Sequence, residues 1–126
     1  MPKQLIAPAD GPAPGGAYSP GIRAGDWLFV AGQGPTDPAT GQLAGATIEE
    51  QTRQVLENVR RILLAGGADM HQVVRATVHL ADLTHFQRFN AVYAEYFPVP
   101  RPVRTTVGSA LPGILVEIDV IAYLGE

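Results

Sequence analysis

The fold is decided by residues 47–81, which read TIEEQTRQVLENVRRILLAGGADMHQVVRATVHLA. Thr47 and Glu50 have the spacing of a capping box, in which each side chain accepts a hydrogen bond from the backbone amide of the other residue. Apolar residues then recur at spacings of three, four and seven, which predicts a helix with one buried face. Gly66-Gly67 predicts its end. The residues of the buried face are Ile48, Val55, Leu56, Val59, Ile62 and Leu63.

The apolar period changes to two between residues 73 and 81, which predicts a strand covered on one face. Its covered residues would be Val74, Ala76, Val78 and Leu80. Upstream, Gly25-Asp26 separates two apolar runs at 21–24 and 27–33, the pattern of a β-hairpin.

A second helix is expected from about residue 84 to residue 97, ended by Pro98 and Pro100. Residues 101–109 and 114–124 are expected as the two strands of a second hairpin, with a turn around Leu111-Pro112-Gly113. The second helix would bury Phe86, Phe89, Val92, Tyr93 and Tyr96.

The order ββαβαββ predicts an α+β sandwich with both helices on one face of a largely antiparallel sheet. Residues 1–126 would form a single domain, and 46% hydrophobic residues suffice for its core. The other sheet face needs a cover, for which a second copy of the chain is the simplest candidate.

Composition narrows the classes of partner and location. The net charge is −3, from 9 basic and 12 acidic residues, and no Lys/Arg cluster could follow a phosphate backbone, so nucleic acid is disfavoured. The chain has no cysteine, which excludes thiol chemistry. No apolar run approaches the roughly 18 residues of a membrane span, and the Pro/Gly-rich start does not resemble a signal peptide. We therefore expect a cytoplasmic protein without membrane contact.

Two charged residues stand out as candidates for chemistry. Glu117 lies within the apolar run 114–121, where it could accept a proton from water in a cleft or simply face solvent on a strand. The guanidinium of Arg104 could hold a small carboxylate through two hydrogen bonds, or could be an ordinary surface arginine. Arg101 is an equally good candidate, and spacing does not separate the two.

Other kinds of site find little support. The three histidines fit no metal-ligand spacing, neither candidate serine lies in a nucleophile elbow, and residues 32–34 are too short for a dinucleotide loop. No metal and no cofactor are therefore expected. The residues considered are His71, His79, His85, Ser19 and Ser109.

Several segments together resemble the RidA/YjgF family of reactive intermediate deaminases, and the match covers nearly the whole chain. The resemblance implies a chorismate-mutase-like α+β fold and a homotrimer whose three sheets pack into a central barrel, with clefts between neighbouring subunits. The segments are Gly16-Ala17-Tyr18-Ser19-Pro20, residues 28–33, Asn58-Val59, residues 90–97, residues 101–105 and Val116-Glu117-Ile118.

The resemblance also implies an activity, the hydrolysis of 2-iminopropanoate and 2-iminobutanoate to 2-keto acids and ammonia without cofactor or metal. Carried onto matching positions, Arg104 would hold the substrate carboxylate and Glu117 would orient and deprotonate the attacking water. The cleft would be lined by Tyr18, Ala31, Gly32, Asn90 and Thr106.

Three features depart from the family pattern. Ala31 stands where many deaminases carry serine, and Thr106 stands where cysteine or a small residue is common. The turn between Arg104 and Glu117 looks about two residues short, which would shift the register of a hairpin unless a β-bulge compensates.

Two alternatives remain open on the sequence. One is a small-carboxylate or metabolite-binding module with a sensor or chaperone-like role, and the other is a ribonuclease or translation inhibitor, which would need a basic surface.

Overall fold

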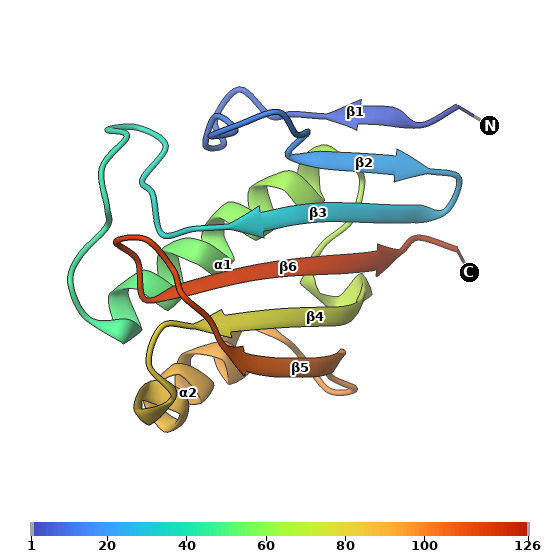
Figure 1. Ribbon diagram of the computed structural model, residues 1–126. Helices are drawn as coiled ribbons and strands as arrows, with labels where there is room; N and C mark the ends of the chain where they lie inside the picture. The colour runs from blue at the N-terminus through green and yellow to red at the C-terminus, as the bar shows by residue number, and fades with distance from the viewer. Residues whose placement is uncertain (1, 126) are drawn as a thin grey trace.

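The computed structural model describes residues 2–125 and has two layers, a six-stranded sheet with two helices on one face (Figure 1). The predicted α+β class is therefore correct. The strand order is β1-β2-β3-β6-β4-β5, and every pair is antiparallel except β4–β5. The elements are β1 (Gln4–Ile6), β2 (Gly21–Ala24), β3 (Trp27–Gln33), α1 (Ile48–Ala65), β4 (Val73–Leu80), α2 (Phe86–Tyr96), β5 (Val103–Gly108) and β6 (Val116–Tyr123), with 3₁₀ turns at Met70–Gln72 and Leu83–His85.

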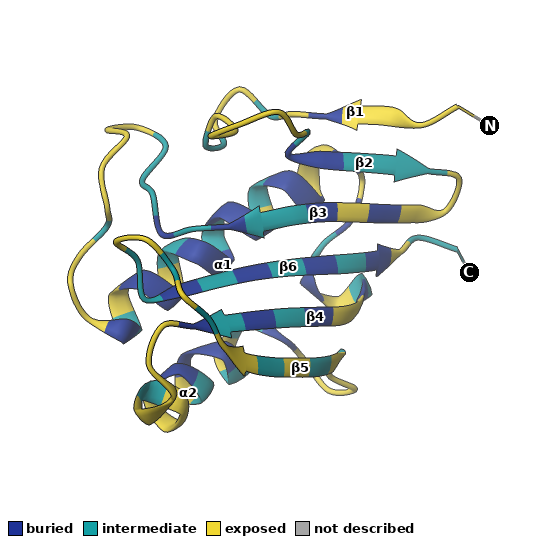
Figure 2. Ribbon diagram, in the orientation of Figure 1, coloured by how far each residue is buried: buried dark blue, intermediate teal, exposed yellow. Residues whose placement is uncertain are grey.

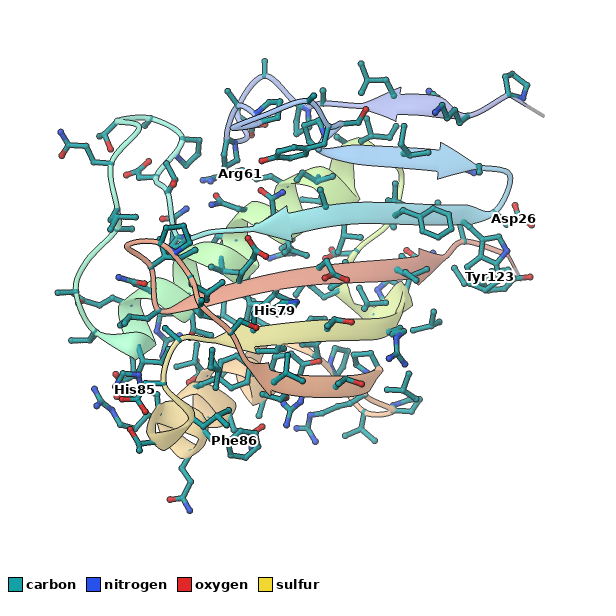
Figure 3. All side chains as sticks on the ribbon, viewed as in Figure 1. Asp26, Arg61, His79, His85, Phe86 and Tyr123 are labelled. Carbon is teal, nitrogen blue, oxygen red and sulfur yellow. The ribbon has the colours of Figure 1, made fainter. Side chains whose placement is uncertain are left out.

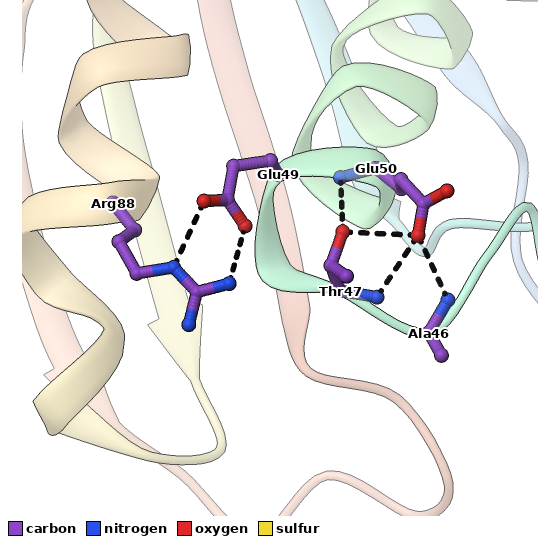
Figure 4. Close-up of polar contacts among 5 residues, drawn as sticks. All are labelled: Ala46, Thr47, Glu49, Glu50 and Arg88. Carbon is purple, nitrogen blue, oxygen red and sulfur yellow. Dashed lines mark hydrogen bonds and ion pairs between the residues drawn. The ribbon is translucent and has the colours of Figure 1, made fainter.

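Helix α1 begins and ends as its sequence predicts. The Glu50 amide donates to the Thr47 hydroxyl at 3.1 Å and the Thr47 amide donates to the Glu50 carboxylate at 3.2 Å, the two bonds of a capping box (Figure 4). All six apolar residues of the predicted stripe are buried. After Gly66 the chain turns at Gly67 with a φ of 91°, a value that glycine adopts without strain.

Helix α2 is shorter than predicted, because Leu83–His85 forms a 3₁₀ turn capped by Asp82. Of the residues expected in the core, Phe86 is exposed and Tyr96 is only partly buried, whereas Phe97 just beyond the helix is fully buried. The ion pair between Arg88 and Glu49, at 2.7 Å, connects α2 to the first turn of α1 (Figure 4).

The predicted second hairpin is wrong. β6 lies between β3 and β4, while β5 runs parallel to β4 at the sheet edge (Figure 1). Burial explains the arrangement, since one side of β6 is fully covered by the helix layer and β5 has no fully buried residue. The connection passes the end of β4, where the Ser109 amide donates to the Leu80 carbonyl and the Ala81 amide donates to the Leu115 carbonyl, both at 3.0 Å.

Two smaller differences concern strands. β1, which was not predicted, pairs with β2 and extends the sheet. Val74 is exposed rather than covered, because a register shift between Val73 and Arg75 interrupts the alternation, while Ala76, Val78 and Leu80 are buried as predicted.

The sheet face away from the helices is rich in exposed apolar side chains, and we call it the open face. Trp27 and Tyr123 lie against each other there, with ring centroids 4.8 Å apart. Figure 2, which views this face, shows buried and more exposed residues alternating along the central strands. The exposed apolar residues of the open face are Trp27, Phe29, Val103, Val107 and Tyr123. In the described residues, no helix combines the length and the apolar character needed to cross a membrane.

Candidate functional site

Arg104 is held by helix α2. It lies on β5 with its side chain toward the helix layer, where its Nη1 donates to Asn90 Oδ1 at 2.8 Å. Its Cζ lies 5.4, 5.7 and 4.7 Å from the ring centroids of Phe86, Phe89 and Tyr93. Such distances allow cation–π attraction, so an amide and three aromatic rings fix the guanidinium in one place.

The charge of Arg104 is nevertheless uncompensated. Three helix arginines, Arg53, Arg60 and Arg88, form ion pairs of 2.7–3.0 Å, whereas Arg104, like Arg61 of α1, forms none with any residue from 2 to 125. A fixed guanidinium with free donors is suited to an anionic ligand, above all a carboxylate.

A cavity of about 340 Å³ lies in front of this group, and we call it the Arg104 cavity. Arg101, which spacing could not separate from Arg104, shares it. On the same strand, the Thr106 hydroxyl is buried and has no hydrogen-bond partner in the described part of the chain. The cavity is lined by Asn90, Tyr93, Ala94, Arg101, Pro102 and Arg104.

A second group of predicted residues lines a hollow of about 280 Å³, which we call the Glu117 hollow. A Cβ atom at Gly32 would lie 2.9 Å from Glu117 Cδ, so only glycine lets the carboxylate rest against this backbone. The Tyr18 hydroxyl accepts a hydrogen bond from the Gly15 amide at 3.0 Å, which positions its ring. The hollow is lined by Tyr18, Ala31, Gly32 and Glu117.

The two groups lie on opposite faces of the sheet. Glu117 stands between the fully buried Val116 and Ile118, so it projects to the open face, whereas Arg104 projects toward α2. The number of residues between Arg104 and Glu117 does not determine how the two side chains face each other. Their strands, β5 and β6, are not paired, because β4 lies between them. One chain therefore does not bring Arg104 and Glu117 to the same small molecule.

Comparison with known proteins identifies the family. The family model described as "Endoribonuclease L-PSP", the model of the RidA/YjgF family, matches residues 9–124. The chain belongs to the RidA/YjgF family. Its relatives include a RutC family protein of Pyrococcus horikoshii, 47% identical over 96% of this chain and 98% of that protein. The chloroplastic Reactive Intermediate Deaminase A of Arabidopsis thaliana is 42% identical, over 97% of this chain and 66% of that protein.

Solved structures of RidA/YjgF proteins share the fold. RidA from an Antarctic Psychrobacter superposes with a TM-score of 0.91 at 35% identity, covering 95% of this chain and 98% of that one. E. coli TdcF with bound serine has a TM-score of 0.91 at 32% identity, covering 97% and 99%.

Asn90 was expected in the cleft, but sequence reasoning missed the three aromatic residues that hold Arg104. Phe86, Phe89 and Tyr93 were interpreted as core, although their spacing of three and four places them on the side of α2 that also carries Asn90. Tyr93 is only 3% exposed, and its hydroxyl has no hydrogen-bond partner within residues 2–125. Burial raises its pKa, and the charges of Arg104 and Arg101 act in the opposite direction.

Histidine and serine meet on the open face, where His79 Nδ1 lies 2.7 Å from Ser109 Oγ (His79 is labelled in Figure 3). Among residues 2–125, no three His, Cys, Asp or Glu side chains come together as they would around a metal ion.

Proposed function

We propose that this RidA/YjgF protein hydrolyses 2-imino acids, such as 2-iminopropanoate and 2-iminobutanoate, to 2-keto acids and ammonia. The observation that carries the proposal is the state of Arg104, a guanidinium fixed by Asn90 and three aromatic rings but without a carboxylate partner in the described chain. A 2-imino acid offers the carboxylate that this guanidinium lacks. The relative named Reactive Intermediate Deaminase A supports the same activity.

The reaction needs few groups. The substrate carboxylate would bind to Arg104 through parallel hydrogen bonds, with the imine carbon exposed to a water molecule held by Glu117. Glu117 would accept one proton as the water oxygen attacks that carbon, and would return a proton to the nitrogen so that ammonia leaves and the carbonyl forms. One water is consumed for each ammonia released. Because the imine carbon is already electrophilic, the proposal includes no metal or cofactor.

The active site would form between copies of the chain. The Arg104 cavity and the Glu117 hollow lie on opposite sheet faces, so a second copy has to bring a Glu117 hollow to each Arg104 cavity. The apolar open face gives such copies a surface to bury. We propose the homotrimer implied by the family resemblance, acting in the cytoplasm, with Tyr18, Ala31 and Gly32 of one copy and Thr106 of the next completing each site.

The first experiment follows keto-acid formation when a threonine dehydratase supplies 2-iminobutanoate and semicarbazide competes for it. Wild type should outcompete the trap. Arg104→Ala should lower kcat/KM by about 100-fold, because a bidentate charged contact is lost. Arg88→Ala is the matched control, since it removes an arginine that faces Glu49 on the outside of α2, and its activity should be unchanged. If the wild-type protein does not reduce the amount of imine that semicarbazide traps, the proposal is refuted.

The site between copies has its own test. Arg104→Ala and Glu117→Gln should each be strongly impaired alone, but random mixing of their subunits should restore native activity at about one quarter of the sites, where both native side chains meet. If both residues of a site came from the same chain, mixed trimers would be as impaired as the single variants.

A carboxylate-binding module without turnover is the second candidate, and Ala31 favours it because its methyl group supplies no hydroxyl beside Glu117. Binding of 2-oxobutanoate that depends on Arg104, without imine hydrolysis, would support this candidate. The net charge of −3 argues against a ribonuclease, for which salt-dependent RNA binding would be the sign.

A further inference from the structure

We infer that the Arg104 cavity is selective for 2-imino acids with a second acidic group, four- or five-carbon imino dicarboxylates, and that Arg101 is the specificity-determining residue. The inference rests on the proposed function and names its substrate class. Hydrolysis of the same C=N bond would consume one water and give ammonia and a 2-keto dicarboxylate.

Charge is the first observation behind this inference. Two arginines, Arg101 and Arg104, line the Arg104 cavity, and none of its lining residues carries a carboxylate. Arg101 and Arg104 form no ion pair with the described residues, unlike Arg53, Arg60 and Arg88 of the helices. A monocarboxylate would compensate Arg104 and leave the charge of Arg101 unmatched. Two carboxylates in one small molecule would compensate both.

The Tyr93 hydroxyl is the second, independent observation. Tyr93 is almost completely buried and is one of the residues that line the Arg104 cavity, and its hydroxyl oxygen is inaccessible and lacks a hydrogen-bond partner among residues 2–125. A buried hydroxyl without a partner costs free energy unless a ligand or water satisfies it. Its ring lies under Arg104, and the charges of both arginines oppose the rise in the Tyr93 pKa that burial causes. An anionic ligand bound between the arginines would offer it an acceptor oxygen.

The distance between the two arginines limits the size of the ligand. Arg101 and Arg104 are three residues apart, so at most about 10 Å of extended chain separates their Cα atoms. Pro102 between them fixes one φ angle and restricts how far the segment can open. Because both arginines line the same cavity, the ligand that we infer is a small molecule with two carboxylates.

The test compares two imines produced in situ under the same semicarbazide competition. L-Aspartate oxidase with catalase supplies 2-iminosuccinate, and threonine dehydratase supplies 2-iminobutanoate. Wild type should prefer 2-iminosuccinate. Arg101→Gln should lower kcat/KM for 2-iminosuccinate by about 10- to 100-fold, the loss expected for one charged hydrogen bond, and change that for 2-iminobutanoate by less than about twofold. Arg101→Lys should recover part of the preference, and Arg88→Gln should keep all of it.

The outcomes separate this inference from the proposed function. Wild-type activity on 2-iminobutanoate with none on 2-iminosuccinate, or an equal loss on both imines in Arg101→Gln, would overturn the selectivity and leave the deaminase intact. Inactivity on both imines would overturn the deaminase. In that case, binding measured by calorimetry would still test the selectivity. Oxaloacetate should bind more tightly than 2-oxobutanoate to wild type but not to Arg101→Gln. Inorganic phosphate competing equally well with oxaloacetate would reveal a general anion site and overturn the inference.

Discussion

Replacing Asn58 should destabilise the protein more than any surface substitution on α1. Its side chain is fully buried, and its amide nitrogen donates to the Gly34 carbonyl at 3.1 Å and to the Thr36 carbonyl at 2.8 Å. These bonds tie the segment after β3 to the helix. Asn58→Asp keeps the shape but removes both donors, and sets a carboxylate against two carbonyl oxygens. Each orphaned carbonyl costs about 1–3 kcal/mol, so the free energy of unfolding should fall by about 2–5 kcal/mol.

Urea unfolding followed by circular dichroism, at one fixed protein concentration because association contributes to stability, measures this loss. Gln54→Ala is the control, since it removes only the bond from Gln54 Nε2 to Asn58 Oδ1, 2.9 Å long, and should cost less than about 1 kcal/mol. If Asn58→Asp cost no more than this control, the two backbone carbonyls would have adequate partners in water and the reasoning would be refuted.

Three further predictions concern single positions. Thr47→Ala should lower the unfolding free energy by about 1 kcal/mol in urea titration, and Thr47→Ser should not, because only the cap hydroxyl is needed. Gly32→Ala should abolish imine hydrolysis while leaving the circular dichroism spectrum unchanged, since the new methyl group displaces the Glu117 carboxylate. Burial alone would raise the pKa of Asp69, but hydrogen bonds from Arg60 and the Met70 amide lower it below its usual 3.8. Its stabilisation is therefore present above that value and lost as the pH falls through the lowered pKa. Urea unfolding at acid pH should show a flatter pH dependence in Asp69→Asn.

The elements that were predicted correctly depend on neighbours along the chain. The capping box at Thr47 involves residues three apart, and the buried stripe of α1 follows the helical period. Such features can be read from one segment without knowledge of the rest of the fold.

The features that were missed depend on distant segments. Nothing local to residues 101–124 indicates that β4 will separate β5 from β6, because the choice is made by the helix layer that covers β6. The bulge at Val74 likewise arises from pairing with β6. For the same reason, the sequence could not predict that Arg104 and Glu117 lie on opposite faces of the sheet. The face to which each side chain points depends on which strands pair with β5 and β6. Asn90 and Arg104, which the sequence could only suggest separately, meet because α2 packs over β5.

The central place of β6 determines when the protein can fold during synthesis. Both neighbours of this strand, β3 and β4, leave the ribosome before it, and neither pairs with the other in the finished sheet. Until residues 116–123 emerge, the nascent chain consists of two half-sheets under an amphipathic helix that has no continuous surface to cover. Cooperative folding therefore waits for β6, and a chain interrupted before residue 116 would expose α1's apolar stripe to chaperones and proteases.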